Sequence, residues 1–278
     1  MLIKWLRRSF IGRRWAHRLV LDFPDFLARV FRGRTHWPPY SLRSFVGGSN
    51  YDEVGHWFLN EFRTLGLFHA DGSILDIGCG CGRIAYALAK DDGIRKQGIR
   101  YEGMDIDRAN IQWCQRHITP LNSRFHFFHA DCFSPSYNPQ GRETSSTYHF
   151  PFPNGAFDFI LLTSVFTHML EEEMRHYLSE TARLLAPGGR IYASFFLFQG
   201  REEVACGAER HGGLAFPHQL HSAAVSRLDY PTHAVAYPEA FVRQMARACG
   251  LRVDEPTRYG LQDLLLFQKE TTTVVPLP

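Results

Sequence analysis

The stretch ILDIGCGCGR, Ile74–Arg83, decides the fold of this chain. Its acid, Asp76, precedes three glycines in the spacing D-x-G-x-G-x-G. Because glycine has no Cβ, the backbone of Gly78, Gly80 and Gly82 can turn tightly and approach a ligand closely. The apolar residues before the loop predict a strand, and those after it predict a helix whose amide dipoles point at the ligand. The stretch therefore predicts a strand–loop–helix unit with a binding site at the loop.

Strands and helices alternate along the rest of the chain. Strands are predicted over 73–77, 99–105, 124–129, 157–163, 190–196, 251–254 and 261–269. Helices are predicted over 51–65, 83–90, 108–117, 174–185 and 238–249. Strands separated by helical segments form parallel sheets with right-handed crossovers. We therefore expect an α/β fold with seven strands. The irregular stretches 133–153 and 199–237 follow strand ends, where such sheets bind ligands.

The first 48 residues are expected to form a basic helical extension ahead of a domain over 49–278. Up to Phe45 the chain has ten Lys/Arg and two Asp, a balance of +8 within a total of +3. The remainder is therefore mildly acidic, which is not typical of a nucleic-acid binder. Within the extension, an apolar stripe at helical spacing predicts a helix capped by Asp22; its members are Phe23, Phe26, Leu27, Val30 and Phe31.

Ahead of that stripe, arginines alternate with large apolar residues. The basic members are Arg7, Arg8, Arg13, Arg14 and Arg18, and the apolar members are Trp5, Leu6, Phe10, Ile11 and Trp15. This pattern is typical of a helix that lies on a membrane surface. It also fits a segment that binds an acidic or lipid-linked substrate or a partner protein, and a helical cap with solvated arginines packed over the predicted binding site; these alternatives stay open. No run of about 18 apolar residues predicts a spanning helix.

Five motifs in order resemble those of the class I S-adenosylmethionine-dependent methyltransferases. They are ILDIGCGCGR, EGMDID (Glu102–Asp107), FFHADC (Phe127–Cys132), FPNGAFDFILLTSVFTHM and LSETARLLAPGGRIYASFF. The resemblance covers roughly 50–269 and is strongest to a bacterial subgroup of small-molecule enzymes. It implies a Rossmann-like sheet of seven strands, mostly parallel with the last strand antiparallel, and S-adenosyl-L-methionine as cofactor.

The resemblance also implies which residues bind the cofactor. Asp105 is expected at both ribose hydroxyls, Asp131 at the adenine amine, and Cys132 or Phe133 beside the adenine ring. The full predicted set is Asp76, Gly78, Cys79, Gly80, Arg83, Asp105, Ile106, Asp131, Cys132, Phe133, Thr163 and Ser164.

Two histidines are the candidate catalytic bases. His168 follows the strand over 157–163, and histidine titrates near neutral pH. His218 is the second choice, within a stretch that also contains His211, His221 and His233. A base is needed if the methyl acceptor is a hydroxyl, whose proton leaves as the methyl arrives.

Other chemistries are less favoured by the sequence. An N-P-P-Y-like turn, common in N-methyltransferases of bases and amides, is absent after the strand over 157–163, which reads TSVF. No metal site is expected, because Cys79 and Cys81 have no CxxC partner pair. An NAD-dependent oxidoreductase would carry G-x-G-x-x-G. A non-catalytic module with this fold is the main alternative.

We therefore expect a cytoplasmic methyltransferase that acts on a small molecule. The scattered cysteines fit a reducing compartment. An oxygen of a glycan, a lipid-linked or a natural-product molecule is the expected acceptor, no nucleic acid is expected as partner, and peripheral membrane contact remains open. The sequence does not define the oligomeric state.

Overall fold

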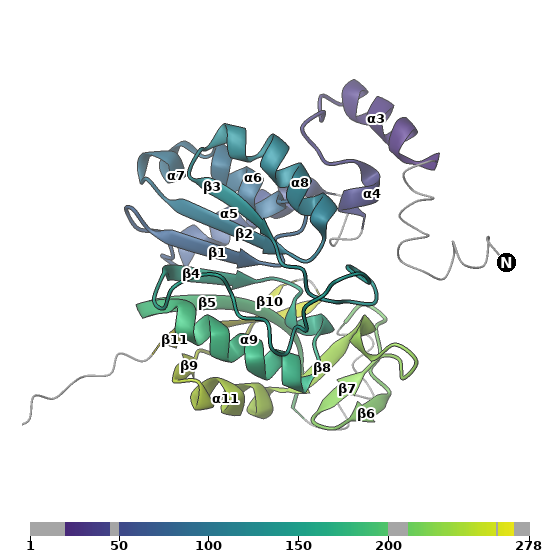
Figure 1. The fold of residues 1–278 in the computed structure, drawn as a ribbon, viewed down its shortest axis with the longest axis vertical. Coiled ribbons are helices and arrows are strands. Elements are labelled where there is room, and N and C mark those ends of the chain that lie inside the picture. Colours follow the sequence, from purple (N-terminus) through teal and green to yellow (C-terminus); the bar gives the residue numbers. More distant parts are fainter. Residues whose placement is uncertain (1–19, 45–49, 200–210, 260, 270–278) are drawn as a thin grey trace, which may run out of the picture. The chain divides into compact units, whose positions relative to one another are not determined.

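The computed structural model describes residues 20–44, 50–199, 211–259 and 261–269 (Figure 1). The chain divides into two compact units, residues 1–72 with 78–144, and residues 73–77 with 145–278. The prediction for the arginine-rich residues 4–18 lies outside the described residues. Each unit is an α/β assembly, so the expected fold class is confirmed.

The first unit contains a parallel pair of strands and several helices, of which the helix over Arg108–His117 packs on both strands. The strands are β2 (Arg100–Asp105) and β3 (Phe125–His129), which pair in parallel with Asp105 opposite His129. The helices are α3 (Asp22–Phe31), α4 (Tyr40–Arg43), α5 (Tyr51–Thr64), α6 (Arg83–Lys90), α7 (Asp92–Lys96) and α8 (Arg108–His117). The rings of Tyr101 and Phe125 stack at 4.9 Å and are fully buried, which fixes the two strands against each other.

The second unit contains the remaining parallel strands. β1 (Ser73–Ile77) pairs with β4 (Phe157–Leu162), and β4 with β5 (Leu185–Phe198), all in parallel. β11 (Gln262–Lys269) runs antiparallel to β5, as expected for the last strand. The helices α9 (Glu171–Leu184) and α11 (Glu239–Ala248) belong to this unit. All five residues of β1 are buried, the polar Ser73 and Asp76 included.

Beyond β5 the second unit continues into strands that the sequence did not predict. β8 (Val235–Pro238) pairs in parallel with β5, and an antiparallel hairpin of β6 (His218–Leu220) and β7 (Ala223–Val225) follows through β7. The predicted strand over 251–254 is present as β9 (Leu251–Val253), and it pairs with β11; the short β10 (Thr257–Tyr259), which was not predicted, also pairs with β11. Strands of three or four residues are too short to show a period of two.

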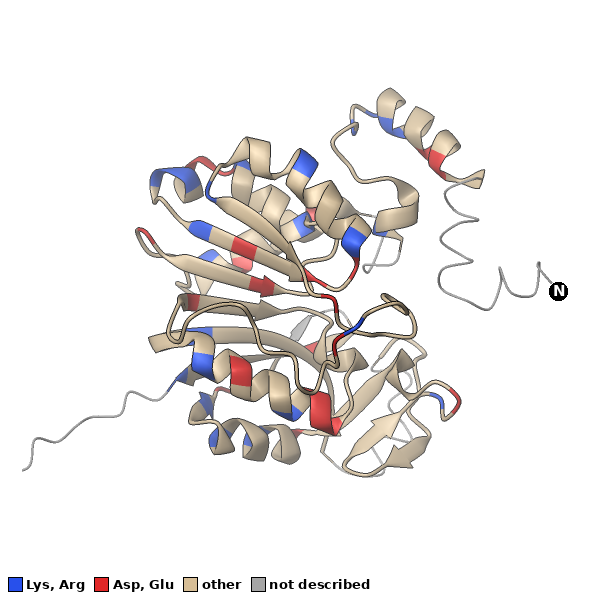
Figure 2. Ribbon diagram, in the orientation of Figure 1, with Lys and Arg blue, Asp and Glu red and all other residues tan. Residues whose placement is uncertain are grey.

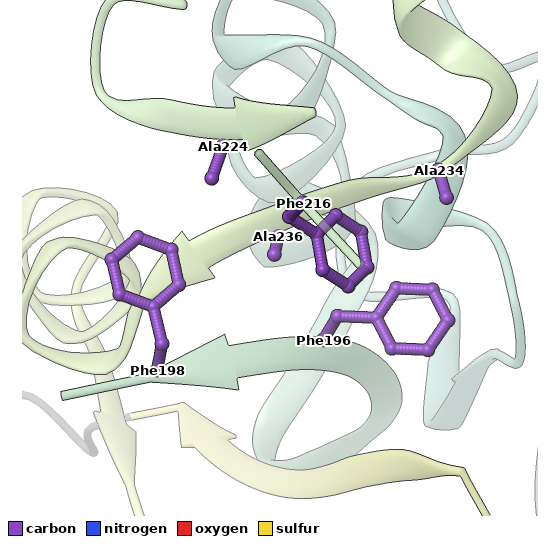
Figure 3. Close-up of a cluster of buried hydrophobic side chains, with 6 residues drawn as sticks. All are labelled: Phe196, Phe198, Phe216, Ala224, Ala234 and Ala236. Carbon is purple, nitrogen blue, oxygen red and sulfur yellow. The ribbon is translucent and has the colours of Figure 1, made fainter. Parts of the chain in front are cut away.

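A small apolar cluster joins β5 to this added region (Figure 3). The ring centroids of Phe196 and Phe216 lie 5.1 Å apart. The cluster is completed by Phe198 and by three small side chains, Ala224 on β7, Ala236 on β8 and Ala234 just before β8. Small residues on β7 and β8 leave room for the phenylalanine rings. The stretch over 199–237 is therefore partly a packed extension of the sheet.

Two local expectations were wrong. Asp22 does not cap α3: the N-cap position is Leu21 without a side-chain bond, and the Asp22 carboxylate instead accepts hydrogen bonds from Ser41. The fifth strand begins at Leu185 and not at Arg190, and its pairing with β4 is irregular between Phe157 and Phe159. The irregularity accommodates Pro187-Gly188-Gly189, a sequence that is typical of a turn. Among the described residues, no helix is long and apolar enough to cross a membrane.

Candidate functional site

The glycine loop between β1 and α6 has the backbone shape that its sequence predicts. Gly78, Gly80 and Gly82 have φ values of 76°, 56° and 78°, a region that side chains with a Cβ rarely adopt. The hydroxyl of Tyr51 donates to the carbonyl oxygens of Cys81 and Gly82 at 3.2 and 3.0 Å. The buried Tyr51 of α5 thus holds the end of the loop, a contribution that sequence reasoning missed.

Asp105, at the end of β2, is bound to the same loop. Its Oδ2 accepts the backbone N–H of Gly80 at 2.7 Å, and its Oδ1 accepts the N–H of Asp107 at 2.7 Å. The N–H groups of Gly78 and Cys79 donate to the carbonyl of Met104 at 2.7 and 3.1 Å. The carboxylate is therefore oriented by two backbone donors, one to each oxygen, and a carboxylate oxygen can accept more than one hydrogen bond. Such a carboxylate suits a ligand that donates two hydrogen bonds.

Asp131, after β3, is held by a loop that returns to it. Arg142 Nε donates to Oδ2 at 2.7 Å and Asn138 Nδ2 to Oδ1 at 3.2 Å. The hydrogen bond from Arg142 lowers the pKa of Asp131, with a further contribution from Asn138. Asp131 is therefore an ionised acceptor at neutral pH. Sequence reasoning missed Arg142 and Asn138, since nothing in their spacing from Asp131 marks them as partners.

The neighbours of these acids are placed as follows. Cys132 is fully buried, whereas Phe133 is 51% exposed and its ring is open to a ligand. His129 Nε2 donates to the carbonyl of Ile106 at 3.1 Å. This hydrogen bond holds the backbone of Ile106, the residue that follows Asp105. Arg83 is the half-buried first residue of α6.

The two loop cysteines are packing residues in this structure. Cys79 and Cys81 are 7% and 1% exposed, and burial raises the pKa of Cys81 far above its usual value. A thiol held neutral in this way is a poor metal ligand or nucleophile. No group of three metal-ligating side chains is found in the described part of the chain.

In the second unit, predicted residues lie at the carboxyl ends of β1 and β4. Asp76 is 1% exposed at the end of β1. Ser164, two residues beyond the end of β4, has φ 59° although it is not glycine. Its N–H donates to Ser194 Oγ at 2.6 Å, and its Oγ accepts from Gln262 Nε2 at 3.0 Å. These contacts from β5 and β11 hold a strained turn, and such strain is concentrated at functional sites. Thr163 lies in the same turn, half-buried.

His168 ends a short 3-10 turn, Phe166–His168, that follows this strained residue. Its Nδ1 lies 3.1 Å from the carbonyl oxygen of Thr232, so Nδ1 carries the proton and Nε2 the lone pair. Burial lowers the pKa of His168, and the bond to Thr232 opposes this in part. The hydroxyl of Tyr237 donates to the next carbonyl, that of Met169, at 2.9 Å. The ring is thus oriented and neutral near pH 7.

The other histidines have different surroundings. His218 is half-buried in β6, which β7 and β8 separate from β5. His211 is buried between Phe196 and Phe216, with Nδ1 2.9 Å from the carbonyl oxygen of Leu261, as expected of a packing residue. His221 and His233 are exposed. His168 is therefore the better-oriented candidate, and His218 remains an untested alternative.

The comparison with known families agrees with the fold and with these motifs. The family described as methyltransferase domain matches residues 56–255, and the chain belongs to it. Residues 56–255 are therefore a methyltransferase domain. This result favours methyl transfer over an NAD-dependent reaction and over a non-catalytic module.

Individual similar proteins match this chain only in part. The chain is similar to 27-O-demethylrifamycin SV methyltransferase of Amycolatopsis mediterranei, 27% identical over 46% of this chain and 40% of the relative. It is also similar to methyltransferase GfsG of Streptomyces halstedii, 27% identical over 63% of this chain and 55% of the relative. The chain thus spans about half the length of these relatives or less. A crystal structure from Pyrococcus horikoshii OT3 shares the fold with TM-score 0.56 and 15% identity, covering 82% of this chain and 94% of that one.

Proposed function

We propose that this enzyme transfers the methyl group of S-adenosylmethionine to an oxygen of a small molecule, with His168 as the general base. The observation that carries the proposal is the pairing of His168 Nδ1 with the Thr232 carbonyl at 3.1 Å. A hydroxyl loses its proton as it is methylated, and a neutral imidazole with a fixed tautomer can accept that proton at Nε2. The acceptor class is a glycan, a lipid-linked or a natural-product molecule. The named activity of the Amycolatopsis relative, methylation of an oxygen on a natural product, supports this class.

The residues of the first unit fit the nucleoside part of the cofactor. The bound carboxylate of Asp105 can accept two ribose hydroxyls, and the ionised Asp131 can accept the adenine amine. The exposed ring of Phe133 can cover the base, and the positive-φ glycines keep Cβ atoms away from the ligand. S-adenosylmethionine, when bound, supplies a methyl group already activated on a sulfonium.

His168 is the residue that we assign to the methyl acceptor. Asp76, Thr163 and Ser164 remain predicted cofactor contacts through the family resemblance. His168 takes the acceptor proton, and the Thr232 carbonyl stabilises the imidazolium that results, because it accepts the Nδ1 proton throughout. Orientation of the acceptor is worth several orders of magnitude in rate by proximity alone.

Two measurements test the proposal. Calorimetry with S-adenosylhomocysteine and with NAD should show binding of the first only. Formation of S-adenosylhomocysteine should then be followed with a panel of hydroxyl compounds that includes 27-O-demethylrifamycin SV. The His168→Gln variant should bind the cofactor normally and lose turnover, whereas His233→Gln should keep both. Full turnover in His168→Gln would rule out this base.

A further inference from the structure

The helix α3 presents its apolar face to solvent. Five large apolar side chains lie within an arc of about 140° on this helix. Their exposed fractions are Phe23 69%, Phe26 48%, Leu27 45%, Val30 47% and Phe31 93%. An amphipathic helix of a globular protein normally turns this face to the core. In α3 the arrangement is reversed.

The opposite, charged face of α3 is what holds the helix to the first unit. Asp22 accepts the N–H and Oγ of Ser41 at 2.8 and 2.7 Å. Asp25 forms an ion pair with Arg43, and Arg29 Nη1 donates to a backbone carbonyl, that of Trp37, at 2.6 Å. The side chains of Asp25 and Arg29 are only 11% and 9% exposed. Rolling the helix to bury its apolar face would break these buried polar contacts, so the exposure is fixed by the fold.

The charges around the apolar face identify what it fits. Both acids of α3 face inward and are paired, whereas Arg32, just beyond the helix, is exposed. The charged residues of α3 itself are Asp22, Asp25 and Arg29 (Figure 2). The 19 residues before Val20 add six cations and no acid; the cations are Lys4, Arg7, Arg8, Arg13, Arg14 and Arg18. A second copy of this chain would bring the same positive charge and be repelled.

We propose that α3 docks on an anionic membrane surface, with its apolar face inserted at the level of the lipid headgroups. Apolar helices flanked by Lys and Arg bind in this way, and each cation near an anionic bilayer adds to the attraction. The large exposed rings of Phe23 and Phe31 supply the insertion, and the arginines supply the electrostatic attraction. This inference does not depend on the identity of the methyl acceptor.

The test uses the full chain and vesicles of two compositions. Vesicles of phosphatidylcholine with 20% phosphatidylserine should bind the protein on flotation, with at least tenfold weaker binding to pure phosphatidylcholine and in high salt. The Phe23→Ser, Phe31→Ser double variant should bind the anionic vesicles at least tenfold more weakly. Because both rings are exposed, this variant should fold and bind S-adenosylhomocysteine as the parent does. The Leu228→Ser variant, altered at a 58% exposed residue of the second unit, is the matched control and should bind vesicles normally.

Three outcomes would overturn the proposal. Equal binding to neutral and anionic vesicles would show that the protein does not recognise an anionic surface. Unchanged vesicle binding by the double variant would show that α3 is not inserted. A dimer of the parent protein that becomes a monomer in the double variant, measured by light scattering, would assign the face to a second copy. None of these results bears on methyl transfer.

Discussion

The Oδ2 atom of Asp105 accepts the backbone N–H of Gly80 at 2.7 Å, so the acid at the end of β2 and the middle glycine of the loop form one rigid element. The second oxygen accepts the N–H of Asp107 at 2.7 Å. The Asp105 carboxylate is therefore held to the backbone through both of its oxygens. A change to this carboxylate should disturb both the loop and the ligand.

Asp105→Asn should weaken the binding of S-adenosylhomocysteine by roughly 10–100-fold. An amide replaces one acceptor oxygen with a donor, and a hydrogen bond to a charged group is worth about 1.5–3 kcal/mol. Calorimetry measures the affinity. The control is Asp91→Asn, since Asp91 also accepts a backbone N–H, that of Ile94 at 2.9 Å, but at the start of α7. Equal affinities in the two variants would mean that Asp105 does not contact the cofactor.

Gly82→Ala should destabilise the protein more than Gly66→Ala. Both glycines have positive φ, 78° and 62°, so alanine is strained at both. An added Cβ at Gly82 would clash with Ile118 Cδ1 and lie 2.8 Å from Cys114 Sγ, whereas at Gly66 it would meet nothing within 4 Å. Overpacking costs about 1–3 kcal/mol, so the free energy of unfolding in urea should differ by that amount. If both variants lost the same free energy of unfolding, the side chains of Cys114 and Ile118 would be able to move aside with no energetic penalty.

Local sequence patterns predicted the elements around the loop. The bounds of β1, α6 and α8 agree with the expected ranges, because each combines an apolar period with a clear start or stop signal. The fold class followed from the alternation of these elements. Short strands such as β6 and β7 carry no such pattern, so they were missed.

Contacts between distant residues could not be predicted from the sequence. Tyr51 supports the loop at Gly82, 31 positions away, and Arg142 holds Asp131 from 11 positions away. The orientation of α3 depends on its pairing with Ser41 and not on its own apolar stripe. In each case a polar contact outside the local pattern determines the position of the side chain.

Phe133→Ala should weaken S-adenosylhomocysteine binding by about 3–10-fold, the loss expected for one aromatic contact of about 0.5–1.5 kcal/mol. Because Phe133 is 51% exposed, its removal should leave the thermal midpoint nearly unchanged. Phe128→Ala is the matched control, since Phe128 is also exposed, at 40%, and lies on β3. Affinity measured by calorimetry should fall in the first variant only. A loss shared by both would indicate a general effect on this region and would argue against a ring contact at Phe133.

The decrease of kcat/KM at acidic pH should reflect the protonation of His168. A base works only when it is deprotonated, and burial lowers the pKa of His168, so the imidazole stays neutral below the usual value of 6.5. We therefore expect kcat/KM to be level above pH 6.5 and to fall only as the pH drops below that value. His168→Gln should lower kcat by about 100- to 10,000-fold, the range for loss of a general base, and should abolish this decrease at acidic pH. Cofactor affinity should stay constant across the same range, which separates proton transfer from binding. A decrease at acidic pH that persists in His168→Gln would assign the titration to another group, and His218→Gln would then be measured in the same way.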